Sequence, residues 1–273
     1  MRINRKMKPL TRVILILGLF GAPVKGIEFE RVLFPIVIYA PSPLPGQTVR
    51  GVPGAYGSHW TTEIVGRNEA DVPVTVQGWQ HPSSCGGIPE CPNYEVSAHT
   101  WFTVYGGSTD GSYPGTFQFV SKPGNDRVFF NLRVVDLSRQ SLTWGTEIPV
   151  VRERDVRTGT VALLNVPTDS RFRTMLRVYD FDGSLSHTVL VRFYAEQDVL
   201  AETELTLSHL GAVTGDIPGY AQIGNFTDTF PQLSAFPRLR VEISPISEGV
   251  RFGAFISVTN NETQHVTVIA PSP

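Results

Sequence analysis

The sequence is poor in charge of either sign and lacks the basic cluster that nucleic-acid binding requires. Of its 273 residues 18% are charged, and the formal net charge at pH 7 is -2, with both signs interspersed along the chain. A protein that holds phosphate backbones or anionic lipid by charge carries a concentrated basic patch. We therefore expect no nucleic-acid partner.

The sequence also lacks the short motifs of common hydrolases and nucleotide-binding enzymes. It has no Gly-x-Ser-x-Gly, no His-Glu-x-x-His and no P-loop, and its six histidines are not paired at metal-ligand spacing. Catalytic triads are assembled in space, so an envelope hydrolase stays open as the third of three readings. We expect a protein that is not an enzyme and that carries no cofactor.

Cysteine is nearly absent, since Cys85 and Cys91 are the only two. In an exported protein, two cysteines this close in sequence predict a local disulfide that closes a short loop. A zinc site would need further ligands, and Cys-x5-Cys is not a usual zinc spacing. We therefore predict a disulfide at this pair and no metal.

Long apolar runs are absent after the N-terminus. Five basic residues among the first twelve precede an apolar run at residues 13–22, which is too short to span a bilayer comfortably. This pattern predicts a cleavable signal peptide over residues 1–26, and an uncleaved anchor is the alternative. We expect a mature chain that is secreted, periplasmic or on the cell surface, with no membrane span after signal cleavage.

The sequence is rich in turn residues that separate short apolar segments. It contains 25 glycines and 21 prolines, and its apolar segments are rich in β-branched and aromatic residues at the intervals typical of sandwiches. Residues 196–207 could form a helix, but residues 202–207 within this segment fit a strand at least as well, so we predict an all-β fold throughout. The clearest predicted strands are 74–76, 101–105, 116–120, 128–135, 175–179, 188–194 and 239–243.

Short matches between the two halves of the chain predict an internal repeat. Residues 144–151 are expected to end one unit and begin the next, which gives two tandem immunoglobulin-like or fibronectin-like β-sandwich units over residues 27–147 and 148–273. The first unit has extra residues around the predicted disulfide loop. The matched positions are Phe34-Pro35 with Ile148-Pro149, Val52-Pro53 with Val166-Pro167, Trp60 and Thr62 with Phe172 and Thr174, Pro114-Gly115 with Pro218-Gly219, Arg133-Val134 with Arg240-Val241, and Trp144-Gly145 with Phe252-Gly253.

Four segments, residues 34–37, 54–62, 68–76 and 252–261, resemble a repeat module of secreted bacterial β-sandwich proteins. Modules of that kind contain Pro-Val-Val, then Gly-x-Trp-x-Thr-x-Leu and an Asn, and end in an aromatic-Gly-x-x-x-Ser-Val segment. The resemblance implies a secreted, sandwich-like and non-catalytic protein of unestablished function. It supplies no catalytic residues, because its motifs are framework residues of strands.

Aromatic residues concentrate between residues 77 and 115. Exposed aromatic rings on a sandwich can stack on sugars or anchor a protein partner. The alternative, which we favour, is that alternate aromatic residues face the core. The candidate ligand-binding residues are Trp79, Tyr94, Trp101, Tyr105 and Tyr113.

Asp180 and Asp182 form the one calcium candidate, because hard cations bind clustered carboxylate oxygens. The adjacent Gly183 lies between apolar strands, and Asp-Gly in that position favours a hairpin turn. No downstream glutamate occurs at EF-hand spacing. We therefore expect a turn here and no bound metal.

These observations predict a non-catalytic, exported structural or adhesive protein of the cell envelope or extracellular space. Its partner would be an unknown protein or glycan at the cell surface. The alternative is a carbohydrate-binding module that uses the aromatic residues of 79–113.

Overall fold

The computed structural model describes residues 28–39, 51–77, 93–104, 111–139, 144–182, 186–208 and 218–271. Within these ranges the chain forms twenty β-strands, five short 3-10 helices and one four-residue α-helix, α1 (Phe226–Thr229). The predicted all-β fold is confirmed. The signal segment, Trp79, Cys85, Cys91 and Tyr105 lie outside the described residues. Within the described ranges, no helix is long and apolar enough to cross a membrane.

The N-terminal sandwich consists of two antiparallel sheets. Their strand orders are β12-β1-β9-β5-β6 and β11-β10-β4-β3, with β7 also paired to β4, and a small separate sheet joins β2 to β8. The strands are β1 (Phe29–Phe34), β2 (Val37–Tyr39), β3 (Val52–Pro53), β4 (His59–Asn68), β5 (Val74–Gln77), β6 (Asn93–Val96), β7 (Trp101–Thr103), β8 (Gly111–Tyr113), β9 (Thr116–Ser121), β10 (Val128–Asp136), β11 (Thr146–Ile148) and β12 (Val151–Arg152).

The C-terminal sandwich has two four-stranded sheets, ordered β13-β18-β15-β16 and β17-β14-β19-β20. Residues 198–207 form β16, so the choice of strand over helix is confirmed. Alternate residues of each central strand face a continuous apolar core between the two sheets. The strands are β13 (Val161–Pro167), β14 (Phe172–Asp180), β15 (His187–Ala195), β16 (Asp198–Leu207), β17 (Gly219–Ile223), β18 (Arg238–Pro245), β19 (Phe252–Asn260) and β20 (Val266–Ile269).

The two sandwiches share one strand order. The run β1-β9-β5-β6 corresponds to β13-β18-β15-β16, and the run β7-β4-β10-β11 corresponds to β17-β14-β19-β20. The registers agree as well: Trp60 pairs with Asp136, the last residue of β10, and Phe172 pairs with Asn260, the last residue of β19. The halves therefore have the common topology that an internal repeat requires.

The last residues of β4 and β14 also have equivalent roles. Asn68 and Asp180 are both fully buried, and the Oδ1 atom of each accepts a hydrogen bond from the backbone N–H two residues later, at 2.9 Å and 2.8 Å. This side-chain turn ends the strand and directs the chain toward the opposite sheet. The two sandwiches therefore share a side-chain hydrogen bond at an equivalent position as well as a strand order.

Most of the short matches that suggested the repeat do not fall on equivalent strands. Trp60 in β4 and Phe172 in β14 do, although both are half-buried at the margin of a core. In contrast, Arg133 lies in β10 and Arg240 in β18, which occupy different places in their sandwiches. Short β-strands share alternation and turn residues, so brief matches arise between strands that are not equivalent.

The segment 144–151 belongs to the N-terminal sandwich and crosses between its two sheets. Ile148 of β11 pairs with Leu132, whereas Val151 of β12 pairs with Leu33 in the other sheet. Pro149 lies between them and has no N–H to continue the first ladder. The strands of the N-terminal sandwich thus extend to Arg152, beyond the predicted division between residues 147 and 148.

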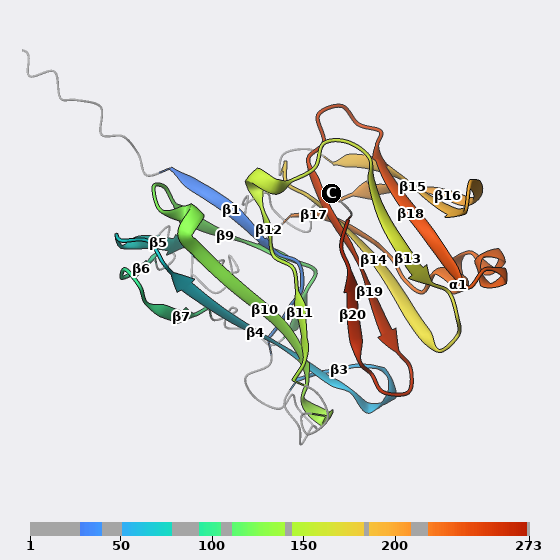
Figure 1. Ribbon diagram of the computed structural model, residues 1–273, viewed down its shortest axis with the longest axis horizontal. Helices are drawn as coiled ribbons and strands as arrows, with labels where there is room; N and C mark the ends of the chain where they lie inside the picture. The colour runs from blue at the N-terminus through green and yellow to red at the C-terminus, as the bar shows by residue number, and fades with distance from the viewer. Residues whose placement is uncertain are drawn as a thin grey trace, which may run out of the picture.

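The two sandwiches are packed together, with the β17-β14-β19-β20 sheet between them (Figure 1). Tyr179 and Phe255, on the outward face of this sheet, are buried in the apolar cluster of the N-terminal sandwich. The Tyr179 hydroxyl donates to the backbone oxygens of Pro35 and Pro114, and Phe181 contacts Phe117 edge-on at 5.1 Å between ring centroids. One apolar core therefore continues from the first sandwich onto the second.

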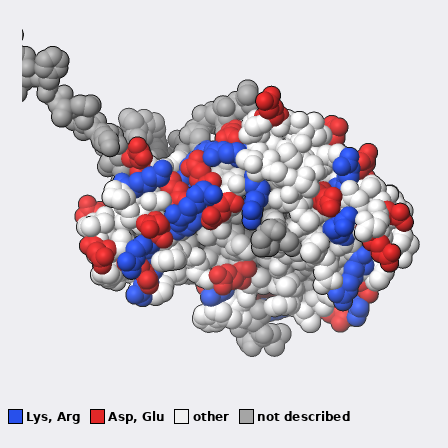
Figure 2. Space-filling view, turned by 45° about the horizontal axis from the view of Figure 1, so that its top comes forward, with Lys and Arg blue, Asp and Glu red and all other residues white. Residues whose placement is uncertain are grey.

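An ionic network crosses the same junction. Glu153 accepts hydrogen bonds from the guanidinium of Arg31 at 2.7 Å and from that of Arg251 at 3.2 Å, and Arg251 also pairs with Asp182 at 2.9 Å. Arg31 lies in β1, and Asp182 follows β14. The network therefore links residues of the two sandwiches. On the face shown in Figure 2, charges of both signs are interspersed.

Candidate functional site

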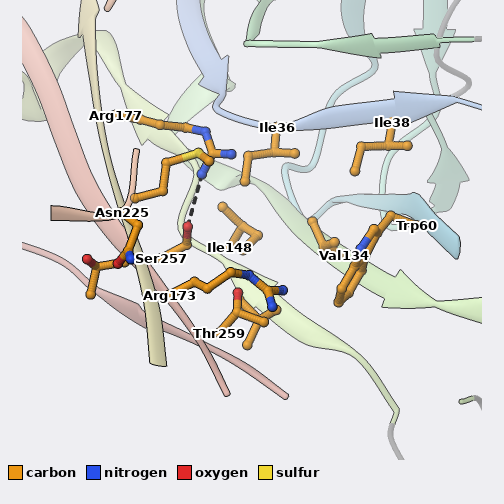
Figure 3. Close-up of a pocket in the computed structure, with 13 residues that line it drawn as sticks. Ile36, Ile38, Trp60, Val134, Ile148, Arg173, Arg177, Asn225, Ser257 and Thr259 are labelled. Carbon is orange, nitrogen blue, oxygen red and sulfur yellow. Dashed lines mark hydrogen bonds between the residues drawn. The ribbon is translucent and has the colours of Figure 1, made fainter. Parts of the chain in front are cut away.

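A groove of about 240 Å³ lies where the outward face of the β17-β14-β19-β20 sheet meets the N-terminal sandwich. We call it the junction groove. Apolar side chains from the N-terminal sandwich form one wall, and polar side chains of β14 and β19 form the other (Figure 3). Its lining consists of Ile36, Ile38, Trp60, Val134, Ile148, Arg173, Thr174, Met175, Arg177, Asn225, Ser257, Thr259 and Val266.

The alternation of β14 presents two arginines to the groove. Leu176 and Val178 are fully buried in the core of the C-terminal sandwich. Arg173, Met175 and Arg177 alternate with them, so their side chains leave the opposite face of the strand. Figure 3 shows Arg173 and Arg177 on one side of the groove, across from Ile36, Ile38 and Trp60.

Both guanidinium groups are held by neutral acceptors. Arg173 donates to the Oδ1 atom of Asn261 at 2.7 Å and to the Oε1 atom of Gln264 at 2.9 Å. Arg177 donates to the Oγ atom of Ser257 at 3.0 Å (Figure 3). Among the described residues, no ion pair includes Arg173 or Arg177. The two positive charges therefore lack a carboxylate counterion in the described structure.

The nearby tyrosines do not supply that negative charge. Burial raises the pKa of Tyr220 above its ordinary value, although Arg177 acts in the opposite direction. Burial also raises the pKa of Tyr179, and by more. Both phenols stay protonated at neutral pH, so the charge on Arg177 is not balanced by a phenolate.

Hydrogen bonds fix the opposite wall. The Oγ1 atom of Thr62 accepts from the backbone N–H of Ile38 at 3.0 Å, which holds β2 against β4. The hydroxyl of Thr146 donates to the backbone oxygen of Val266 at 2.6 Å and joins β11 to β20. A Cβ atom at Gly54 would lie 2.5 Å from the Trp60 indole nitrogen, so the absence of a side chain at Gly54 leaves room for the indole. The wall is formed before any ligand arrives.

The predicted aromatic residues are spread over different sheets. Tyr94 lies in β6, Trp101 in β7 and Tyr113 in β8, and these strands belong to three separate sheets. The Trp101 side chain is 66% exposed, with the Arg67 guanidinium 4.8 Å from its ring centroid. Trp101 also lines a second cavity of about 270 Å³. The described aromatic residues therefore do not form one platform on one sheet.

The two aspartates of the calcium candidate are engaged with protein groups. Asp180 accepts from the backbone N–H of Asp182 and lies 2.6 Å from the Nδ1 atom of His187, while the Asp182 carboxylate pairs with Arg251. Burial raises the pKa of Asp180, against the hydrogen bonds it receives. No group of three or more metal-ligating side chains occurs in the described part of the chain.

The predicted hairpin at these aspartates is wrong. β14 pairs with β17 and β19, whereas β15 pairs with β16 and β18 in the facing sheet. The connection between β14 and β15 therefore crosses from one sheet to the other. The buried turn at Asp180 ends β14 at this point.

Comparisons with known proteins identify no relative. No family model matches the sequence, and neither a curated protein nor a solved structure matches the chain.

Sequence reasoning did not identify Arg173 and Arg177 as functional residues. Alternating arginines in an otherwise apolar strand are typical of a solvated sheet face. The signal that separates these two from ordinary surface arginines is tertiary, because the face of β14 that carries them meets a second sandwich.

Proposed function

We propose that this chain is a non-catalytic, exported structural or adhesive protein whose two sandwiches act as one rigid body. The observation that carries this proposal is the apolar core shared across the junction, in which Tyr179 and Phe255 of the C-terminal sandwich pack against the N-terminal one. Domains joined by a small polar interface move relative to each other, whereas an apolar junction restrains them. A rigid pair of sandwiches suits a protein that holds two surfaces at a fixed distance or transmits force between them.

The composition of the junction groove supports a role in binding rather than catalysis. Its described lining contains no His, Asp, Glu or Cys. Of its hydroxyl groups, Thr174 accepts from the backbone N–H of Phe226 and Ser257 accepts from Arg177. A nucleophile requires an adjacent base that is itself oriented by a third group. The lining supplies hydrogen-bond donors and apolar surface but no such pair.

Cell fractionation, envelope binding and substrate turnover test this proposal. We expect the chain in the exported fractions of the cells that make it, and we expect the purified mature chain to bind isolated envelopes saturably without turning over ester, peptide or glycoside substrates. Cytosolic location, or turnover that survives repurification, would contradict the proposal. The protein to purify consists of residues 27–273, because residues 1–26 are the predicted signal peptide.

A carbohydrate-binding role is the second candidate, and one observation favours it. Trp101 lines the cavity of about 270 Å³ together with Gln118, whose buried Oε1 atom has no hydrogen-bond partner. An exposed indole beside an unpartnered amide oxygen can hold a sugar ring and one of its hydroxyl groups.

Titration with neutral oligosaccharides tests the second candidate. We expect Trp101→Ala to abolish any binding. The matched control is Trp144→Ala, because Trp144 is 79% exposed and likewise has an arginine, Arg133, 5.0 Å from its ring centroid. Equal loss in both variants would show that the cavity is not the binding site.

A further inference from the structure

We propose that the junction groove binds an extended peptide segment in which two acidic residues flank an aliphatic one, spaced acid-x-aliphatic-x-acid. This inference rests on the proposed function, because it identifies the class of partner that an adhesive protein would hold at this site. Three features of the groove support it: its charge, its spacing and its apolar surface.

The charge of the groove favours an anionic occupant. A guanidinium has five N–H donors, and its preferred acceptors are carboxylates and phosphates. Arg173 donates to Asn261 and Gln264, and Arg177 donates to Ser257 and to the hydroxyl of Tyr220. Two carboxylates from a partner would therefore supply the counterions that Arg173 and Arg177 lack among the described residues.

The spacing of the arginines matches an extended peptide. Arg173 and Arg177 are four residues apart on one face of β14, so their Cα atoms are separated by about 13 Å at the rise of a strand. Acidic residues at positions i and i+4 of an extended peptide have the same separation and point in the same direction. Each guanidinium can then receive one carboxylate.

The apolar wall selects a peptide over a sugar chain. Ile36, Ile38 and Ile148 provide aliphatic surface beside the arginines. An aliphatic side chain at position i+2 would lie between the two carboxylates and against that surface. The groove volume of about 240 Å³ is below the roughly 300–1,000 Å³ of sites for drug-sized ligands, so it has room for the aliphatic side chain of the peptide and not for the whole segment.

Fluorescence anisotropy with a labelled peptide tests the inference. The probe is Glu-Ser-Val-Ser-Glu with both ends blocked, so that only side-chain carboxylates carry charge. We expect saturable binding to the mature chain that weakens as salt is raised. Replacing both glutamates of the probe by glutamine, or its valine by serine, should weaken binding at least tenfold.

Variants of the chain locate the site. The double variant Arg173→Gln/Arg177→Gln should weaken binding at least tenfold, while Arg192→Gln, an exposed arginine of β15 paired with Glu202, should leave it unchanged. Because loss of Arg173 could unsettle the fold, Arg177→Lys is the second variant. It keeps the charge but loses the planar fork, and it should weaken binding several-fold without changing the melting temperature.

Three results would overturn the inference. The first is equal affinity for the glutamine and the glutamate probes, and the second is unchanged affinity for the probe in the double variant. The third is displacement of the labelled probe by an oligouronate at a concentration equal to or below that of unlabelled peptide, which would make the occupant an acidic glycan. These failures are distinct from failure of the proposed function. If the chain is exported and binds envelopes but does not bind the probe, the proposed function stands and the peptide site is rejected. If the chain is cytosolic or turns over a substrate, the proposed function is rejected whether or not the probe binds.

Discussion

At the scale of single residues, Glu153 joins the two sandwiches electrostatically. Burial opposes its ionisation, but hydrogen bonds from the guanidinium and backbone N–H of Arg31 and from Arg251 outweigh that penalty and lower its pKa from 4.5 to about 2. A carboxylate with a lowered pKa in the folded state stabilises the fold above its unfolded pKa. That contribution is lost as the pH falls through the folded pKa.

We therefore predict that Glu153 contributes about 1–2 kcal/mol at neutral pH, lost between about pH 4.5 and 2, because solvent screens part of the attraction at this partly exposed carboxylate. Urea unfolding of the wild type and Glu153→Gln across this range is the measurement. The variant should be less stable at pH 7, and its stability should fall less steeply with acid. Glu202→Gln, which breaks the exposed pair with Arg192, is the control and should follow the wild type. Identical pH profiles for Glu153→Gln and the wild type would refute the assignment.

Asn68 is the second residue with a defined structural role. Its buried amide donates to the backbone oxygens of Val72, Val96 and Ser97 at 3.0–3.1 Å, and its Oδ1 atom accepts from Ala70. Replacement by alanine leaves several of these buried groups unpaired, so we predict that Asn68→Ala lowers the unfolding free energy by about 2–3 kcal/mol. Chemical denaturation measures this.

The control for Asn68 is a second asparagine in a central strand. Asn131→Ala, at a half-buried position of β10, should change stability by less than about 0.5 kcal/mol. A loss below about 1 kcal/mol for Asn68→Ala would mean that solvent satisfies the carbonyl groups it now holds.

At the scale of elements, the sequence predicted the positions of the strands better than it predicted which strands pair with each other. Residues 128–135 and 175–179 lie in β10 and β14, because β-branched and aromatic residues report the local preference for extended backbone. Pairing is decided by contacts between distant segments, and local patterns do not report those. For example, Ile148-Pro149 resembles Phe34-Pro35 in sequence, but the strands that contain these residues have different places in the fold. β11 is an edge strand that pairs with β10, whereas β1 pairs with β9. The groove depends on such distant contacts and was not predicted.

The disulfide remains a prediction at this scale, since Cys85 and Cys91 lie outside the described residues. A closed loop of about seven residues removes little entropy from the unfolded chain, so the bond should contribute at most about 2–2.5 kcal/mol. Thermal melts of the wild type and Cys85→Ser/Cys91→Ser should show a folded variant with a slightly lower midpoint. Two titratable thiols in protein purified from an oxidising compartment would refute the bond, and an unfolded double variant at room temperature would refute its local role.

At the scale of the whole molecule, the polar contact of Tyr179 across the junction is open to a direct test. Its side chain is fully buried, and both hydrogen-bond acceptors of its hydroxyl, Pro35 and Pro114, belong to the N-terminal half. We predict that Tyr179→Phe lowers stability by about 1–3 kcal/mol, because the hydroxyl is then missing beside these carbonyl groups. Tyr220→Phe is the control, since its hydroxyl bonds the exposed Gln222 of the same strand. Equal small losses in both variants, measured by urea unfolding, would contradict the role assigned to Tyr179.

The central claim is that the two sandwiches move as one rigid body, because one apolar core and one ionic network cross the junction. Nitrogen-15 relaxation of backbone amides in both sandwiches tests this most directly. We predict that a single rotational diffusion tensor fits the amides of β4 and β10 together with those of β15 and β18. Two tensors with different correlation times, one for each sandwich, would contradict the account.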